Sequence, residues 1–579
     1  MKEELPASGM WWSLADGDIC PSCSGDRLGP VGCNVFLFSK SKERYSLPQL
    51  LSQPPTEIQS FLENLQIKHQ HNAMLDAILP EVFQRLSFMR NVGLEYLSLN
   101  RETASLSGGE SQRIRLAGQL GSNLSGVLYV LDEPSIGLHP ADNQKLIDSL
   151  RLLQSKGNSL LVVEHDQETI LQADWIIEIG PKAGEHGGRV VASGKPLSLA
   201  KKGLSGTGHC LLEGFPHPLR GNWRKLVPVT SKTGNAYLKL SKVKFRNLKN
   251  LSLTIPLARL TVCCGVSGSG KSSLIRGTLF QGIKQSVKEN KGVLKHEDYV
   301  LKNGNNFSKV IEVSQAPIGK TSRSTPVTYL GIWTRIRDLI STLPEAKARG
   351  LSPSDFSFNI KGGRCETCKG AGRVKLEMNF LPDTYIGCEE CQGRRYKDEV
   401  LSLSWHGKNI AEILDMTFDE AVDFFSFDEL LRKTFMLMCQ TGLGYLKLGQ
   451  TSPTLSGGEA QRLKLASELG NGIEIQGRKH VTQKKNFYVL EEPSIGLHPK
   501  DCEKLLLLLH QLVDDGHTVV IIEHDIDLIA EADFLIELGP KGGEAGVELL
   551  HQGSVKSLIK KASSPTAKFL KKALKGSLE

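Results

Sequence analysis

Short runs of consecutive apolar residues, each ending in acidic residues or leading into a glycine-rich loop, recur along the chain and predict buried strands. Four of them stop at Asp-Glu, Glu-Glu or Glu-His-Asp: LYVL (128–131), LLVV (160–163), FYVL (487–490) and VVII (519–522). A fifth, LARLTVCC (257–264), precedes a glycine-rich loop and the helical pattern SSLIRGTLF (272–280). Unbroken apolar runs of this length are typical of parallel strands buried on both faces. We therefore expect α/β domains with mostly parallel sheets.

The chain repeats itself, because three stretches of its first half recur in its second half. They are SLSGGESQRIRLAGQLG (105–121), which returns at 454–470, LYVLDEPSIGLHPAD (128–142), which returns at 487–501, and VVEHDQETILQADWIIEIGP (162–181), which returns at 521–540. The displacement is 349 residues for the first stretch and 359 for the other two. The extra ten residues fall in the polar, basic segment 471–486, which we expect to be a surface loop. Such repetition predicts a duplicated domain.

The segment VCCGVSGSGKSS (262–273) has the G-x-x-x-x-G-K-S spacing of a phosphate-binding P-loop between a predicted strand and a predicted helix. Its glycines allow backbone N–H groups to face phosphate oxygens at the start of the helix: Gly265, Gly268 and Gly270. Lys271 is expected to neutralise the β- and γ-phosphates. Ser272 is expected to ligate Mg²⁺, and Ser273 beside it to contact the nucleotide. The loop predicts that the chain binds a nucleoside triphosphate.

Acidic residues at the strand ends provide the other parts of a hydrolytic site. In YVLEEP (488–493) Glu491 is expected to act on Mg²⁺, and Glu492 to orient or deprotonate the attacking water. His524 ends the next predicted strand, from which a histidine can reach a γ-phosphate. The first half carries the corresponding residues: Asp132, Glu133 and His165.

Two cysteine pairs in the second half have the spacing of a structural zinc site. Cys365, Cys368, Cys388 and Cys391 form Cys-x2-Cys-x19-Cys-x2-Cys, and ligation by thiolates alone indicates a structural Zn²⁺. The first half has one such pair, Cys20 and Cys23, displaced by 368 residues from the later pair. The same displacement places the missing partners at −3 and 0, before the first residue. A local turn with Cys33 as third ligand is the alternative.

Composition fits a soluble globular protein. The chain has 579 residues, 40% of them hydrophobic, and a net charge of +8, which is compatible with nucleic-acid binding without requiring it. No apolar run approaches the roughly 20 residues that cross a bilayer, and the start lacks the features of a signal peptide. Six of the twelve cysteines form CxxC pairs, which favours metal ligands over disulfides. We therefore expect a cytoplasmic protein without a membrane partner.

These motifs resemble a known family. LSGGE together with a P-loop is the signature of ABC-type ATPases, and the set LSGGEAQR, DEPSIGLHP, GVSGSGKSS, FSFNIKGGRCETC and MNFLPDTYIGCEEC is similar to the excinuclease A (UvrA) family. That family supplies the damage-sensing ATPases of bacterial nucleotide excision repair. The likeness runs from about residue 20 to about residue 555.

The resemblance implies two tandem ABC-type ATPase halves of P-loop NTPase fold, with helical signature insertions and a four-cysteine zinc module. The first half would be incomplete. The expected divisions are a remnant of the first half (1–193), a linker (194–237), the second half (238–556, with the zinc module at 361–396) and a basic tail (557–579). We expect the tail to be frayed and solvated, with a DNA-contacting amphipathic helix as the alternative.

In ABC ATPases the P-loop of one half faces the LSGGE of the other half. The resemblance therefore implies one complete ATP site, made by 265–272, Gln315, Glu491, Glu492 and His524 and closed by Ser107, Gly108 and Gly109. The opposite site, with Asp132, Glu133 and His165 facing 456–458, would lack a P-loop. Glu491 is one methylene longer than Asp132, and Mg²⁺ tolerates little geometric error. Hydrolysis at the complete site is therefore expected to be slow, with ATP binding retained.

The implied partner is double-stranded DNA, preferably damaged, in the cytoplasm of a bacterium. Basic residues around the zinc module would contact phosphates, although such a cluster is also typical of a solvated surface: Arg364, Lys369, Arg373, Lys375, Arg394, Arg395 and Lys397. A homodimer, or a second chain that supplies the missing N-terminal part, is a further expectation. Docking of the excinuclease B subunit is doubtful, because only about 105 residues precede Leu106.

Two other functions stay open. The chain could be a nucleotide-gated DNA-binding remnant or split subunit with little hydrolysis, which Glu491 and the missing first P-loop favour. It could also be the motor subunit of an ABC transporter, although a zinc module is hard to explain in that class. Zinc content and DNA affinity discriminate between these functions.

Overall fold

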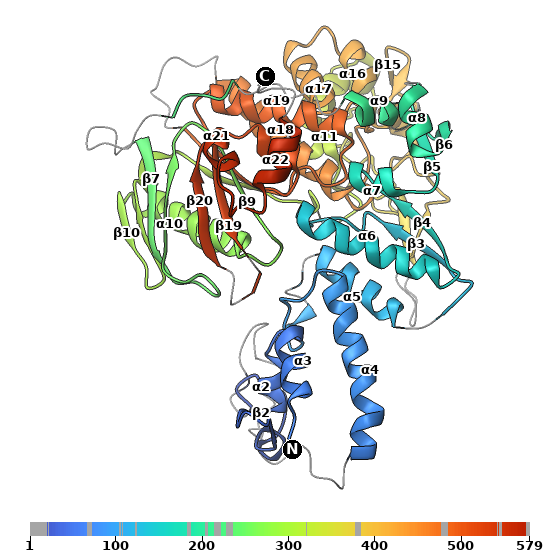
Figure 1. The fold of residues 1–579 in the computed structure, drawn as a ribbon. Coiled ribbons are helices and arrows are strands. Elements are labelled where there is room, and N and C mark those ends of the chain that lie inside the picture. The colour runs from blue at the N-terminus through green and yellow to red at the C-terminus, as the bar shows by residue number, and fades with distance from the viewer. Residues whose placement is uncertain are drawn as a thin grey trace, which may run out of the picture. The chain divides into compact units, whose positions relative to one another are not determined.

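A computed structural model of the chain describes residues 20, 23–66, 72–103, 106, 108–121, 124–181, 184, 187–202, 206–213, 222–226, 236–319, 321–376, 384–475, 485–540, 542–543 and 547–574. The chain divides into two compact units (Figure 1). The first comprises residues 1–163 and 541–546, and the second comprises residues 164–540 and 547–579.

The first unit is mainly helical and contains the first LSGGE segment. Its elements are α1 (Pro30–Cys33), β1 (Phe36–Phe38), β2 (Arg44–Ser46), α2 (Leu47–Leu51), α3 (Pro55–Glu63), α4 (Asn72–Asn91), α5 (Gly108–Leu120), β3 (Leu128–Asp132), α6 (Pro140–Ser155) and β4 (Ser159–Val163). The long helix α4 packs against α3, α5 and α6. Fully buried leucines fill the core between α4, α5 and α6: Leu94, Leu120 and Leu146.

The second unit is built on a six-stranded sheet in the order β12-β17-β18-β9-β19-β20. Its strands are β9 (Leu260–Gly265), β12 (Val310–Val313), β17 (Phe487–Glu491), β18 (Thr518–Ile522), β19 (Phe534–Gly539) and β20 (Glu548–Gly553). The first five run parallel and β20 pairs antiparallel with β19. Every residue of β9, β18 and β19 is buried, and for β9 and β18 this agrees with the prediction from their unbroken apolar runs. The sheet places the P-loop at the end of its inner strand β9.

A smaller antiparallel sheet covers one face of this parallel sheet. Its order is β10-β11-β7-β8, with β7 (Tyr237–Val243), β8 (Leu251–Pro256), β10 (Val293–Lys295) and β11 (Val300–Lys302). The helix that follows the P-loop starts as the π-type helix η6 (Ser273–Phe280) and continues as α10 (Gln281–Glu289), followed by the short turn η7 (Gly304–Asn306). One apolar core joins these elements to β9, β17, β18 and β19.

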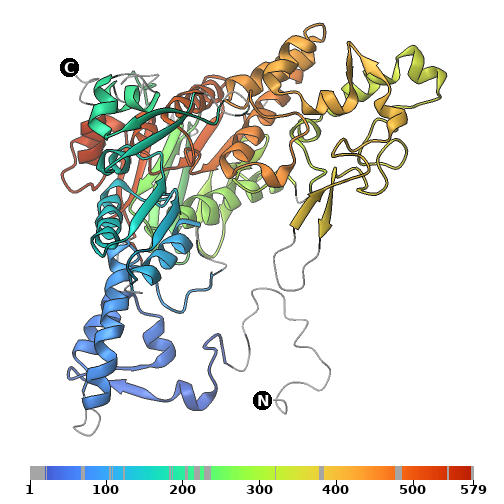
Figure 2. The same cartoon turned by 90° about the vertical axis from the view of Figure 1, so that its right-hand side faces the viewer.

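Helices and the cysteine-rich module occupy the region between β12 and β17, drawn in yellow and orange in Figure 2. The elements of this region are α11 (Pro326–Tyr329), α12 (Trp333–Ser341), α13 (Pro344–Ala348), β13 (Arg373–Leu376), β14 (Thr384–Gly387), α14 (Asp398–Leu401), β15 (Ser404–Trp405), β16 (Lys408–Asn409), α15 (Ile410–Asp415), α16 (Phe418–Phe424), α17 (Glu429–Gln440), η8 (Ser452–Thr454) and α18 (Gly457–Ile475). The second LSGGE segment begins α18. That helix includes the first five residues of the expected loop 471–486, of which 476–484 lie outside the described residues.

The expected linker 194–237 contains helical structure. After α7 (Gln167–Gln172), β5 (Ile176–Gly180) and β6 (Arg189–Gly194), the chain forms α8 (Pro196–Lys202) and α9 (Gly206–Glu213). Further along, Trp223 donates its indole N–H to the carbonyl of Ala530, and Arg224 forms an ion pair with Asp533. The expected domain boundaries stay a prediction.

The expectation of a frayed, solvated tail is wrong for the residues described up to 574. The chain ends in α21 (Val555–Ile559) and α22 (Ala567–Ala573), which follow α19 (Pro499–Asp514) and α20 (Ile526–Ala530) in the second unit. Leu558, Leu570 and Leu574 are fully buried in the main core. These leucines stabilise the helices, while the lysines that suggested solvation occupy the remaining positions. Residues 575–579 lie outside the described part of the chain.

The repeated strands of the two halves differ in exposure. β3 pairs with β4 as β17 pairs with β18, and β5 pairs with β6 as β19 pairs with β20, but the first-half strands form two separate two-stranded sheets. Val130 on β3 is 64% exposed, whereas its counterpart Val489 is fully buried. Ile179 on β5 is 69% exposed, whereas its counterpart Leu538 is fully buried. The first-half strands therefore present apolar faces whose counterparts in the second half are covered.

The described helices are all too short or too polar to span a lipid bilayer.

Candidate functional site

The P-loop is a tight backbone turn between β9 and η6. Gly265, Gly268 and Gly270 all have positive φ angles, at 135°, 73° and 84°, a region that glycine adopts without strain. A Cβ on Gly265 would lie 2.1 Å from the carbonyl oxygen of Leu538 on the neighbouring strand β19. Lys271 donates from Nζ to the carbonyl oxygens of Gly265 and Val266, both at 2.9 Å. The lysine ammonium therefore lies over the inside of the loop.

Replacing Gly265 by alanine should destabilise the second unit, because the new methyl group would meet backbone that cannot move aside. We expect a loss of about 2–4 kcal/mol in the free energy of unfolding, from overpacking and backbone strain. Gly331→Ala is the matched control, since Gly331 also has a positive φ of 75° but open space around its Cβ position. Urea unfolding of both variants measures the loss of stability. Equal unfolding midpoints for Gly265→Ala and Gly331→Ala would contradict the prediction.

Ser272 and Glu491 meet at the mouth of the P-loop. The Ser272 hydroxyl donates to Oε1 of Glu491 at 2.6 Å, so both oxygens expected to act on Mg²⁺ lie side by side. Arg276 donates to the other oxygen of Glu491 at 2.7 Å and to Glu312 at 2.5 Å. Burial lowers the pKa of Arg276, but the two carboxylates outweigh burial and raise it overall. The guanidinium thus fixes the orientation of the Glu491 carboxylate.

Glu492 lies in contact with two other predicted residues. Oε1 of Glu492 is 3.6 Å from Nε2 of His524, and Gln315 donates its amide N–H to the Glu492 backbone carbonyl at 3.1 Å. Glu492 has a φ of 45°, as does its first-half counterpart Glu133. A non-glycine residue in this region is strained, and such strain concentrates at functional sites. The structure therefore brings Gln315, Glu492 and His524 together.

The turn after β18 is organised by a buried carboxylate that the sequence analysis did not single out. Glu523 accepts hydrogen bonds from the backbone N–H of His524 at 2.7 Å and of Ser494 at 3.0 Å. Burial raises the pKa of Glu523, while these hydrogen bonds act in the opposite direction. Glu164 in the first half accepts from the backbone N–H of His165 in the same way. Glu-His-Asp occurs in both halves of the sequence. This repeat was the signal that could have identified the buried glutamate as the acceptor that organises the turn.

Sequence reasoning also missed two other residues. Arg276 lies four residues after Ser272, one helical turn away, which is the spacing that could have indicated it. Gln461 donates from α18 to the carbonyl oxygens of Val313 and Glu491, both at 3.1 Å. Its counterpart Gln112 donates to the carbonyl of Asp132 at 2.6 Å. The repeated GGE-x-QR therefore carries a link between the signature helix and the strand-ending acid.

In both LSGGE segments a glycine packs closely against the backbone carbonyl of an isoleucine. A Cβ on Gly458 would lie 2.9 Å from the Ile495 carbonyl oxygen, and a Cβ on Gly109 would lie 2.5 Å from that of Ile136. In the second half, Glu459 accepts from Tyr445 Oη at 2.5 Å and from the Ser456 backbone N–H at 2.7 Å.

The predicted composite site is divided between the two units. Gly108 and Gly109 begin α5 in the first unit, whereas the P-loop belongs to the second unit, and Ser107 lies outside the described residues. Closure of the P-loop by these residues stays a prediction. Asp132 and Glu133 likewise belong to the first unit and His165 to the second.

The four cysteines of the second half form one buried cluster. Their sulfur atoms all lie within 4.8 Å of one another, with Cys365–Cys388 at 3.9 Å and Cys368–Cys391 at 3.7 Å. Tetrahedral zinc with Zn–S bonds of about 2.3 Å places its sulfurs about 3.8 Å apart, so the cluster fits Zn²⁺. Burial raises the pKa of Cys365 and Cys391, whereas the backbone N–H of Cys391 lowers that of Cys388.

The first-half pair forms no such cluster with other described residues. Cys20 is exposed and Cys23 is half-buried. The pKa of the Cys33 thiol is raised, mainly by loss of solvation and further by the neighbouring Asp26 and Cys23. Binding of a metal by Cys20 and Cys23 stays a prediction.

Comparison with known proteins gives a consistent result. UvrABC system protein A of Thermus thermophilus is 46% identical over 554 residues, which cover 95% of this chain and 56% of that protein. The Listeria innocua protein of the same name is 44% identical over 562 residues, covering 96% and 56%. The crystal structure of UvrA2 from Deinococcus radiodurans matches with a TM-score of 0.83 and 39% identity, covering 96% of this chain and 66% of that chain. No family model matches the chain.

The resemblance noted in the sequence is thus confirmed over nearly the whole chain, as is the expected α/β ABC ATPase fold. The chain spans little more than half the length of the curated relatives it matches. It carries the P-loop, both LSGGE segments and the cysteine cluster within the matched residues, and it is similar to UvrA proteins over nearly its whole length.

Proposed function

We propose that the chain is a DNA-binding ATPase of nucleotide excision repair that hydrolyses ATP at the P-loop of its second half. One observation carries the proposal: Lys271, Ser272, Glu491, Glu492 and His524 converge from three adjacent parallel strands onto one loop. This is the edge of an open α/β sheet at which ligands bind. The family relationship supports the same activity.

Each residue has a role that follows from its position. Lys271 binds the β- and γ-phosphates, to which the P-loop backbone N–H groups also donate. Ser272 and Glu491 are the residues that would hold Mg²⁺, which neutralises charge on the phosphates when bound. Glu492 accepts a proton from, or orients, the attacking water. His524, 3.6 Å from Glu492, contacts the γ-phosphate.

The second unit supplies the P-loop, and Ser107, Gly108 and Gly109 would close the nucleotide from the first-half signature. A second copy of this chain is a further proposed partner. We place the protein in the bacterial cytoplasm. Zn²⁺ at the four cysteines would have a structural role, because four thiolates leave no position for a water ligand.

Duplex DNA is the proposed partner, with damaged DNA preferred. The family relationship and the basic residues of the cysteine module support it, since Lys and Arg contacts to phosphates bind any sequence. Preference for damage would then arise from the deformability of the duplex.

A nucleotide-gated DNA-binding protein with little hydrolysis is the second candidate. Both oxygens of Glu491 are engaged, one by Ser272 and the other by Arg276. A carboxylate held in this way is slower to adjust to the octahedral geometry of Mg²⁺. In this case ATP binds and DNA affinity responds to it, while turnover stays low.

Glu492→Gln distinguishes the two candidates. If Glu492 acts on the attacking water, the variant should lose turnover by about 10²- to 10⁴-fold while ATP still binds. Phosphate release is measured with and without damaged duplex DNA, and ATP affinity is measured separately. Glu503→Gln is the control. Glu503 lies on α19, the helix that follows β17 and its two strand-ending glutamates in the chain. If the wild-type chain turns over ATP no faster than Glu492→Gln, the result rejects the ATPase and supports the nucleotide-gated DNA-binding protein.

A further inference from the structure

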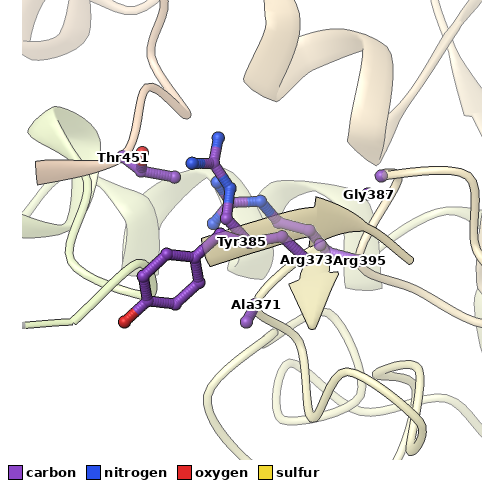
Figure 3. A pocket seen from close by; sticks show the side chains of 8 residues that line it. Ala371, Arg373, Tyr385, Gly387, Arg395 and Thr451 are labelled. Atoms are coloured by element: carbon purple, nitrogen blue, oxygen red, sulfur yellow. The ribbon is translucent and has the colours of Figure 1, made fainter. Parts of the chain in front are cut away.

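A cavity of about 350 Å³ lies between the cysteine module and the segment that leads to the second LSGGE, outside the ATP site. Eight residues line it: Ala371, Gly372, Arg373, Tyr385, Gly387, Gly393, Arg395 and Thr451. Figure 3 shows the two arginine side chains together, with Thr451 and the ring of Tyr385 beside them. Half of the lining residues are glycine or alanine, so a ligand can approach the backbone closely.

Arg395 is the central residue of this cavity. It is only 7% exposed, its guanidinium lies 5.1 Å from the Phe358 ring centre, and its Nη2 donates to the Gly449 carbonyl at 2.8 Å. Its Nη1 is buried and has no hydrogen-bond partner among the described residues. A buried guanidinium nitrogen without a partner is costly, which indicates that a ligand completes it.

Arg373 adds a second positive charge to the same space. Across the described part of the chain, neither arginine forms an ion pair with a carboxylate. Both guanidinium groups border the same cavity, so two positive charges face one space (Figure 3). An anion between them would remove the repulsion and gain charge-assisted hydrogen bonds.

We propose that this cavity binds one phosphate group, through Arg373, Arg395 and the Thr451 hydroxyl, with Tyr385 against the sugar or base that carries it. A planar guanidinium pair matches phosphate geometry, and 350 Å³ exceeds what a free phosphate fills. Thr451 directly precedes η8, which leads to Ser456 and α18. The bound phosphate would therefore join the cysteine module to the signature segment.

The phosphate can come from the DNA backbone or from solution, and the first source rests on the proposed DNA-binding function. The test uses the full chain with Lys271→Ala, which removes phosphate binding at the P-loop. Arg373→Gln is the pocket variant. Arg335→Gln is the control, because Arg335 lies on α12 outside the cysteine module, pairs with Asp428 at 2.5 Å and does not line the cavity. Zinc content and circular dichroism verify that each variant is folded.

Inorganic phosphate binding is followed by ³¹P line broadening, and binding of a labelled duplex by fluorescence anisotropy at several salt concentrations. We expect Arg373→Gln to weaken binding of one probe about tenfold, and Arg335→Gln to leave that probe bound. If duplex is the affected probe, the slope of log affinity against log salt should fall by about 0.9.

A loss with duplex alone assigns the site to backbone phosphates, and a loss with inorganic phosphate assigns it to a free anion. The proposal is overturned if both probes bind Arg373→Gln as they bind the parent, or if Arg335→Gln weakens binding equally. Because the phosphate arm involves neither DNA nor ATP hydrolysis, its failure is separate from failure of the proposed ATPase.

Discussion

Lys271→Ala should lower ATP turnover by at least about 100-fold, the effect of removing one preorganised donor to a developing charge. Lys271 has the only ammonium group that the P-loop motif itself supplies, and its Nζ lies 2.9 Å from two carbonyl oxygens inside the loop. Without it, the β- and γ-phosphates lose a full positive charge in a partly dry site. Phosphate release and the affinity for a fluorescent ATP analogue should both fall.

Lys288→Ala is the control, because Lys288 lies exposed on α10, the continuation of the helix that follows the P-loop. Its turnover should equal that of the parent. A melting temperature measured for each variant shows whether the loss of two loop hydrogen bonds has unfolded the second unit. Unchanged turnover in a folded Lys271→Ala variant would contradict the proposed site.

Cys388→Ser should remove one equivalent of zinc per chain and unfold the cysteine module. Structural zinc contributes on the order of 10 kcal/mol to small domains, since the site rarely exists without the ion. Val374 is the one partly buried apolar neighbour of the cysteine cluster among the described residues, so apolar packing around the cluster cannot replace the metal. Metal analysis gives the zinc content, and limited proteolysis should cut within residues 361–396.

Cys439→Ser is the control, because Cys439 is a half-buried cysteine on α17 outside the cluster. It should retain zinc and resist cleavage. If Cys388→Ser retains the same zinc content as Cys439→Ser, the four cysteines do not hold the metal. Addition of a chelator to the parent should reproduce the Cys388→Ser digestion pattern.

The parallel sheet could be predicted because its strands are unbroken apolar runs that end in functional residues. β9, β17 and β18 end within one residue of the ends of the runs at 257–264, 487–490 and 519–522. The burial of the helical tail could not be predicted from the sequence. Lysines stand between Leu570 and Leu574, and this lysine-rich pattern is typical of a solvated segment. α21 and α22 form because the main core accepts their leucines, which is a tertiary effect.

The sequence predicts the individual motifs of the candidate site more readily than the hydrogen bonds that join these motifs. Motif spacing identified the P-loop, the acids and the cysteines, whose geometry is local. The link from Arg276 to Glu491 spans 215 residues, and the link from Gln461 to Val313 spans 148, so no local pattern contains them. The cavity at Arg395 depends on the approach of Thr451, 56 positions further on, for the same reason.

The exposed faces of β3 and β5 mean that the chain should not unfold as one cooperative body. In the second half the same strand positions are sealed on both sides, so their amide hydrogens exchange only in rare, large openings. Leu128, Val130, Ile177 and Ile179 have most of their side chains in water, and within the described part of the chain their two-stranded sheets have unpaired edges. Such edges open frequently and pair readily with other chains. The first-half strands are therefore expected to exchange their amide hydrogens first, well before the P-loop core of the second half opens.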